Sequence, residues 1–232
     1  MFYYDPTYFL VLIGVALSLF ASSKVNRTFA KFQRVPNRLG ITGREAAEQI
    51  LHQAGIYDVS VERVSGQLTD HYDPGNKVLR LSDSTYQSSS VAAIGVAAHE
   101  CGHAIQHATG YAPLRFRGAL VPVANFGASI AWPLIFIGML LTSRSSVMMI
   151  NIGIVAFSLS VLFHIVTLPV EFDASGRAVR ILERGGILYP EEVDGTKKVL
   201  KAAALTYVAG AASAILQLLR ILLLTGGRRN ND

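Results

Sequence analysis

Four apolar stretches limit what this chain can fold into, because each is close to the length of a membrane-spanning helix. Such a helix takes about 20 predominantly apolar residues. Only 16% of the 232 residues are charged, whereas soluble domains carry about a quarter. The sequence therefore predicts a mainly α-helical membrane protein with four transmembrane helices and a small soluble part. The four stretches are residues 8–23, 119–141, 147–170 and about 202–224.

The basic residues predict which side of the membrane each connecting segment occupies. Eleven Lys and Arg residues lie between the first two stretches, and six lie between the last two. Because Lys and Arg are enriched in cytoplasmic segments, residues 24–118 and 171–201 are expected in the cytoplasm and the N-terminus outside. Lys24 is the first basic residue, whereas a secretory signal peptide opens with positive charge. The first stretch is therefore interpreted as an uncleaved anchor.

These assignments divide the chain into five segments. The two arms of the predicted transmembrane hairpin are separated only by residues 142–146, and Pro122 and Pro133 predict kinks in its first arm. The basic residues behind the net charge of +5 are interpreted as an ordinary solvated surface, so nucleic acid is not an expected partner. The segments are an N-terminal anchor (1–23), a cytoplasmic region (24–118), the transmembrane hairpin (119–170), a cytoplasmic helical region (171–201) and a C-terminal transmembrane helix with its tail (202–232).

The first cytoplasmic region carries the signals of a small α+β domain. Residues 42–54 have helical periodicity, with Thr42 at the N-cap position and Gly55 just beyond the end. The Asp-Pro-Gly-Asn sequence at 73–76 predicts a turn between strands, and a small antiparallel sheet is expected. From about Ser84 the chain is expected to be helical again. Three segments are expected to form the strands: residues 56–64, 67–72 and 77–82.

The motif that carries chemistry is His99-Glu-Cys-Gly-His103, which has the form H-E-x-x-H on a predicted helix. Residues four apart share one helical face, with Cβ atoms about 5–6 Å apart, so the two imidazoles can bind one tetrahedral zinc ion. Glu100 lies at the edge of that face, where it can reach a zinc-bound water without binding the metal. The motif therefore predicts a catalytic zinc site with Glu100 as the general base.

A catalytic zinc ion usually takes three protein ligands, so the motif leaves one ligand to be found. His107 continues the i, i+4 series, but it lies about 6 Å further along the helix axis. A metzincin would have a histidine six residues after His103, and that position is Thr109. His164 lies inside the third apolar stretch, where hydrogen bonding between helices is the more common role. None of these side chains is the expected third ligand.

Glu171 is the expected third ligand. It is the first carboxylate after Glu100 in the chain, and the intervening hairpin returns it to the same side of the membrane. Pro169 can start a new helix with Glu171 in its first turn. In that position a carboxylate also favours the helix dipole, which is the alternative reason for its presence.

Several motifs together resemble those of the YugP-type neutral zinc metallopeptidases of bacterial membranes. The resemblance implies a gluzincin-like endopeptidase of the bacterial plasma membrane, with a zincin-like cytoplasmic domain and one zinc ion per chain. It also implies that His99, His103 and Glu171 hold the zinc ion and that Glu100 is the base. The motifs are LTDHYDP (68–74), KVLRLS (77–82), SVAAIGVAAHECGHAIQ (90–106), LPVEFDAS (168–175) and VLKAAALTYV (199–208).

The arrangement is also similar to that of the HtpX-type proteases, in which a transmembrane hairpin separates the two histidines from the glutamate. Those enzymes have an acid four residues after the glutamate, which orients a ligating histidine. This chain has Ser175 at that position, and Asp173 lies two residues after Glu171 on a different helical face. Asp173 is therefore only a candidate for orienting a ligand.

A peptidase also has to hold its substrate extended and to stabilise the oxyanion of the tetrahedral intermediate. The strand at 77–82, with Leu79 and Leu81, is expected to offer an edge on which a substrate strand can pair. Four side chains are candidates for donating a hydrogen bond to the oxyanion: His71, Tyr72, Arg177 and Tyr207.

The leading hypothesis is a zinc endopeptidase that cleaves membrane or membrane-proximal proteins at the cytoplasmic face. Its expected partners are a peptide or membrane-protein substrate and membrane lipid, while an accessory regulator and a homo-oligomer stay open. One alternative is a non-catalytic zinc-binding membrane scaffold or regulator, but a structural zinc site needs no base such as Glu100. The other is a site-2-type intramembrane protease, whose motif lies within a span; the short apolar run before His99 disfavours it.

Overall fold

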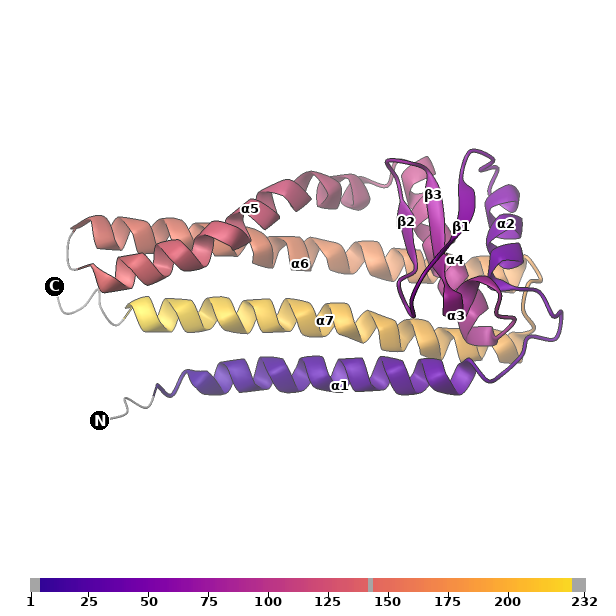
Figure 1. Ribbon diagram of the computed structural model, residues 1–232, viewed down its shortest axis with the longest axis horizontal. Coiled ribbons are helices and arrows are strands. Elements are labelled where there is room, and N and C mark those ends of the chain that lie inside the picture. Colours follow the sequence, from indigo (N-terminus) through magenta and orange to yellow (C-terminus); the bar gives the residue numbers. More distant parts are fainter. Residues whose placement is uncertain (1–4, 142–143, 227–232) are drawn as a thin grey trace. The chain divides into compact units, whose positions relative to one another are not determined.

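The computed structural model describes residues 5–141 and 144–226 and shows a mostly helical chain with one small sheet (Figure 1). The chain forms two compact units. One takes in Met1–Ala21, Phe116–Leu168 and Thr206–Asp232, and the other takes in Ser22–Arg115 and Pro169–Leu205. The first unit holds most of the apolar helical sequence, and the second holds the sheet and the H-E-x-x-H motif. The expected fold class, a mainly α membrane protein with a small α+β part, is confirmed.

Among the described residues, four long helices have the length and apolar composition of membrane-spanning helices, which is the number expected. Each helix is longer than the apolar stretch that predicted it. The hydropathy pattern identifies only the apolar part of a helix. Backbone hydrogen bonding continues into the polar residues beside it, so the helix is longer. The four helices are α1 (Tyr8–Phe32), α5 (Ala112–Leu140), α6 (Arg144–Arg184) and α7 (Pro190–Gly226).

Large apolar side chains lie on the outside of these helices within the first unit. Leu12 is 67% exposed, Phe126 is 66% exposed and Leu140 is 68% exposed. Soluble monomers rarely expose contiguous apolar surface of this kind, because it favours aggregation in water. The surface of the first unit therefore suits the hydrocarbon of a bilayer.

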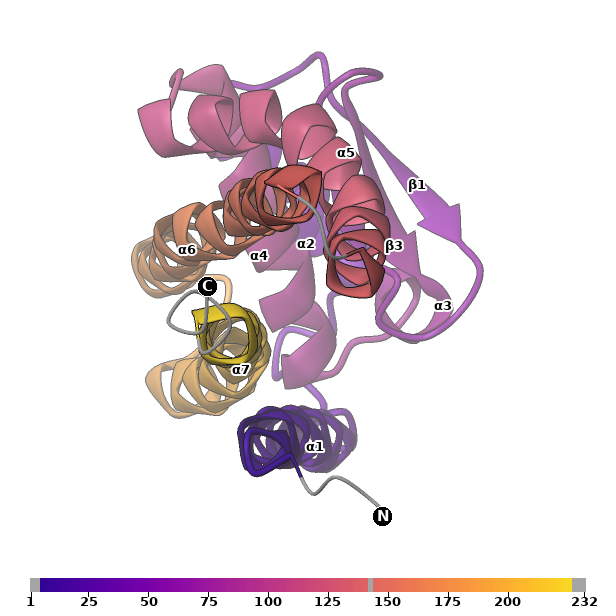
Figure 2. The ribbon, with the colours of Figure 1, turned by 90° about the vertical axis from the view of Figure 1, so that its left-hand side faces the viewer.

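Small residues bring the helices of the first unit into contact. The hydroxyl of Ser213 on α7 donates a hydrogen bond to the carbonyl of Gly14 on α1, at 3.1 Å. On α5, a Cβ at Gly127 would lie 2.6 Å from the carbonyl oxygen of Ala156 on α6. Glycine and serine at such positions let backbones approach closely, which is how helices associate in lipid. Figure 2 shows α1 and α7 nearly end-on, one beside the other.

The predicted hairpin is formed by α5 and α6, which follow one another with a short connection. The connection was expected at 142–146, but residues 142–143 lie outside the described part of the chain. Pro122 and Pro133 both lie inside α5. The helix changes direction along its length (Figure 1), which is the expected effect of proline inside a helix.

The second unit begins with the end of α1 and the amphipathic helix α2 (Gly43–Gln53). Thr42 is its N-cap, and the side chains of Thr42 and Glu45 form a reciprocal capping box. Gly55 has a positive φ of 72° just beyond the helix, a conformation that glycine adopts without strain. The prediction of this helix and of both its ends is confirmed.

The sheet has three strands: β1 (Ser60–Val64), β2 (His71–Asp73) and β3 (Val78–Ser82). The expectation of an antiparallel sheet is wrong for one of its two pairs. The order is β1-β3-β2, so β3 lies between the others and pairs antiparallel with β2 but parallel with β1. The turn expected at 73–76 is present, and the carboxylate of Asp73 accepts backbone hydrogen bonds from Gly75 and Asn76. Strand order depends on contacts between distant segments, which a local pattern does not reveal.

The expectation that the strand at 77–82 offers an edge to a substrate is also wrong. β3 is hydrogen-bonded to a strand on each side. Leu79 and Leu81 are fully buried in the main core of the second unit, where α2, α4 and α6 supply most of the other side chains. Their apolar character reflects core packing and not a binding surface. The unpaired edges of the sheet belong to β1 and β2.

The helix expected from about Ser84 is two helices, α3 (Asp83–Tyr86) and α4 (Val91–Ala108). The chain breaks between them, and the hydroxyl of Ser90 caps the backbone N–H of Ala93 at the start of α4. Most of α4 is buried. Its small residues allow this, since the backbone of another helix lies directly against it.

Candidate metal centre

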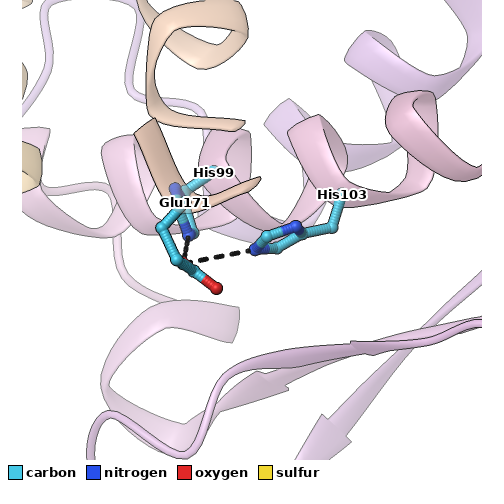
Figure 3. A group of neighbouring side chains, drawn as sticks. All are labelled: His99, His103 and Glu171. Atoms are coloured by element: carbon cyan, nitrogen blue, oxygen red, sulfur yellow. Dashed lines mark ion pairs between the residues drawn. The ribbon is translucent and has the colours of Figure 1, made fainter. Parts of the chain in front are cut away.

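Two helices of the second unit supply the candidate metal ligands. His99 and His103 lie one turn apart on α4, and Glu171 lies on α6 (Figure 3). The two helices touch at Gly102, where a Cβ would lie only 2.6 Å from the carbonyl oxygen of Ala174. Glycine at this point lets α6 approach closely enough for Glu171 to reach the two histidines.

The three side chains converge on one point, and Figure 3 shows both imidazole rings directed at the carboxylate. The Oε2 atom of Glu171 lies 3.3 Å from Nε2 of His99 and 3.6 Å from Nε2 of His103. One donor atom from each residue lies within 4.8 Å of the other two. In a tetrahedral zinc site with zinc–ligand distances of about 2.0–2.1 Å, ligand atoms lie about 3.3–3.4 Å apart. The donor set therefore fits a zinc ion, and the two distances to Glu171 are close to those of a tetrahedral site.

Electrostatics also favour a divalent cation here. Glu171 is 2% exposed and Glu100 is 8% exposed, so two carboxylates lie in a largely buried site. Burial by itself lowers the pKa of His103, but the hydrogen bond to Glu171 and the charge of Glu100 raise it above its ordinary value. The raised pKa shows that the site attracts positive charge.

The expectation that Pro169 starts a new helix before Glu171 is wrong. α6 runs from Arg144 to Arg184 with Pro169 inside it. A proline within a helix removes one backbone hydrogen bond, and helices packed against neighbours tolerate that loss. Glu171 therefore lies in the interior of a long helix and not in its first turn. A favourable interaction with the positive N-terminal end of the helix dipole does not explain why a carboxylate occurs here.

The second ring nitrogen of each histidine also has a partner. Nδ1 of His103 lies 3.0 Å from Oε1 of Gln106, and Nδ1 of His99 lies 3.2 Å from the hydroxyl of Ser175. Sequence reasoning missed Gln106, although a glutamine three residues after a histidine on a helix lies on the same face. Ser175, at the position where an acid was sought, contacts a histidine itself.

The other candidates take different places. Asp173 and Arg177 form an ion pair on α6, and Asp173 joins the site through Gln106. The hydroxyl of Tyr72 lies 2.9 Å from Nδ1 of His107, which leaves His107 outside the ligand cluster, as expected. His71 is exposed on β2. Tyr207 and His164 belong to the first unit. His164 is not among the three clustered donors, and the role of Tyr207 at the oxyanion stays a prediction.

Comparisons with known proteins show the family of the chain. A family profile described as "Putative neutral zinc metallopeptidase" matches residues 7–226 of the chain. The chain is 46% identical over 224 residues to "Putative membrane protease YugP" of Bacillus subtilis (strain 168), and the alignment covers 96% of this chain and 98% of that protein. No solved structure matches the chain.

Proposed function

Because this chain belongs to the family of neutral zinc metallopeptidases, we propose that it is a membrane-anchored zinc endopeptidase in which His99, His103 and Glu171 hold one zinc ion. The observation that carries the proposal is the approach of Glu171 Oε2 to both imidazole Nε2 atoms, at 3.3 and 3.6 Å. Two histidines and a glutamate, with a fourth position left for water or substrate, are the donor set of catalytic zinc sites.

Zinc, when bound, polarises a substrate carbonyl and lowers the pKa of water. Glu100 supplies the base: it follows His99 directly and its carboxylate is largely buried. We propose that this carboxylate takes a proton from the attacking water and delivers it to the nitrogen of the leaving amine. Glu100 thereby acts first as a general base and then as a general acid.

The proposed substrates are membrane proteins or proteins close to the membrane, cleaved at the cytoplasmic face. Two features support this. The four apolar helices hold the chain in the bilayer, and most of the basic residues lie in the segments that form the second unit, which by the positive-inside rule favours the cytoplasm. A protease fixed in this way meets substrates that share its membrane.

Metal removal tests the proposed activity directly. We expect the purified full-length chain in detergent to contain about one zinc ion, as a site with one ligand set binds one metal. A chelator should abolish hydrolysis of a quenched fluorescent peptide, and added Zn²⁺ should restore it. Zinc content is measured by mass spectrometry of the metal. Hydrolysis that persists at full rate in the zinc-free protein would refute the proposal that the activity depends on zinc.

A matched pair of variants on α6 locates the metal. Glu171→Ala is expected to lose most of the bound zinc, because one of three protein ligands is removed. Glu183→Ala is the control, since Glu183 lies on the same helix and pairs with Lys197 on α7 at 2.6 Å. Zinc retained equally in both variants would show that Glu171 is not a ligand.

The orientation is tested by thiol labelling in membrane vesicles. Gln87→Cys places an exposed thiol in the second unit, whereas the natural Cys101 is buried and should not react. An impermeant maleimide should label Gln87→Cys in inverted vesicles and not in intact cells. Wild-type chain is the control for Cys101. Labelling in intact cells would place the site outside the cytoplasm.

A further inference from the structure

We propose that Gln106 positions His103 for metal binding by fixing which of its ring nitrogens carries the hydrogen. The inference deepens the proposed function, because it assumes that His103 is a zinc ligand. It concerns a side chain that is fully buried and lies one turn beyond His103 on α4.

Three contacts determine the orientation of the Gln106 amide. Its Nε2 lies 2.8 Å from the carbonyl oxygen of Val170 and 2.8 Å from Oδ2 of Asp173. Both partners are acceptors, so the NH₂ group has to face them. Oε1 of Gln106 is then the atom that lies 3.0 Å from Nδ1 of His103.

The orientation of the amide decides the tautomer of the histidine. Since Oε1 only accepts hydrogen bonds, Nδ1 of His103 has to donate. A neutral imidazole carries one hydrogen, so Nε2 keeps its lone pair. Nε2 is also the atom that lies 3.6 Å from Glu171 Oε2. Gln106 therefore presents the nitrogen that faces the other ligand in the form that binds a metal.

Asp173, which accepts a hydrogen bond from Gln106, is itself held in place. Oδ2 of Asp173 also accepts a hydrogen bond from Nε of Arg177, at 2.5 Å. The guanidinium of Arg177 lies 5.5 Å from the centre of the Tyr111 ring. Asp173, which was expected on a different face from Glu171, thus reaches the metal site indirectly, through Gln106. Residues from α4, α6 and the segment after α4 cooperate to orient one ligand.

In the part of the chain that the structure describes, the contact of His99 does not impose an equivalent constraint. Its Nδ1 lies 3.2 Å from the hydroxyl of Ser175. A hydroxyl can donate or accept, so this contact fits either tautomer. The assignment of a fixed tautomer therefore applies to His103 alone.

Removing the polar atoms of Gln106 should weaken zinc binding. Gln106→Met keeps the length of the side chain, and zinc affinity is expected to fall about 10–100-fold, as for other residues that orient a metal ligand. The measurement is competition for Zn²⁺ against a chelating dye with the full-length chain in detergent. Gln87→Met is the control, because Gln87 is exposed at the end of α3. Unchanged affinity in Gln106→Met would overturn the proposal.

A double variant separates orientation from packing. Gln106→Glu should also weaken zinc binding, because a carboxylate offers no hydrogen to Val170 O or to Asp173. Adding Asp173→Asn supplies an NH₂ group that can donate to Glu at position 106. The double variant is expected to bind zinc about tenfold more tightly than Gln106→Glu alone. If Asp173→Asn failed to restore zinc affinity, the proposed hydrogen bonds from Asp173 through Gln106 to His103 would be contradicted.

The tautomer can be observed without any metal. In the zinc-free Glu171→Ala variant with ¹⁵N-labelled histidine, where no carboxylate at position 171 faces Nε2, neutral His103 is expected to show hydrogen on Nδ1. Gln106→Met should shift its signals toward a mixture of tautomers. If Gln106→Met lowered Tm but left these signals and zinc affinity unchanged, its role would be packing and the proposal would be wrong. Because this readout needs no metal, a wild-type chain that bound no zinc would refute the proposed function separately.

Discussion

Replacing Glu100 with glutamine is expected to lower kcat for peptide hydrolysis by about 10²–10⁴-fold, the usual contribution of a general base. Glutamine matches the size of the side chain but cannot take a proton from water. Such a loss corresponds to about 3–5 kcal/mol of transition-state stabilisation. Because Glu100 is not among the clustered donor atoms of His99, His103 and Glu171, zinc content should stay at the wild-type value.

The control for this variant is Glu48→Gln. Glu48 lies on α2 and pairs with Arg44 at the surface, away from the ligand cluster. We expect its activity and zinc content to match those of the wild-type chain. Full activity in Glu100→Gln would rule out the proposed mechanism. A wild-type chain that bound zinc but hydrolysed no peptide would make a non-catalytic zinc protein the better description.

The grouping of His99, His103 and Glu171 could be predicted from the sequence because its signals are of two simple kinds. The spacing of His99 and His103 is local, and any helix brings residues four apart to one face. The place of Glu171 was inferred from the expected topology, in which a transmembrane hairpin returns the chain to the same side of the membrane. Neither argument requires knowledge of how side chains pack, and the structure places the three side chains together.

The sequence could not predict the contacts that depend on distant segments. Gln106 binds Val170 and Asp173, which are 64 and 67 residues away in the chain. The central position of β3 likewise results from pairing with β1 on one side and β2 on the other. Alternating apolar residues show that a strand is buried, but they do not show whether it lies at an edge. For this reason the sequence pattern suggests that Leu79 and Leu81 bind a substrate, whereas they pack in the core.

The second large effect is expected from Gly102, where the backbone of α6 lies directly against α4. A Cβ at this position would lie 2.6 Å from the Ala174 carbonyl oxygen and 3.1 Å from two further backbone atoms. Because backbone cannot rotate away as a side chain can, Gly102→Ala should push the helices apart. Overpacking of this kind costs about 1–3 kcal/mol. Ala174 is three residues from Glu171, so the displacement should also carry the third ligand away from the histidines.

Two other glycine variants separate the loss of the metal from the loss of stability. At Gly95, also on α4, a Cβ would meet the side chain of Thr196 at 2.7 Å, so Gly95→Ala should lower Tm but keep the zinc ion. At Gly118 on α5 nothing lies within 4 Å, so Gly118→Ala should change neither. Thermal unfolding and zinc content of the three variants are measured in the same detergent. If Gly102→Ala kept its zinc as firmly as Gly95→Ala does, close contact between α4 and α6 would not be what brings Glu171 to the metal.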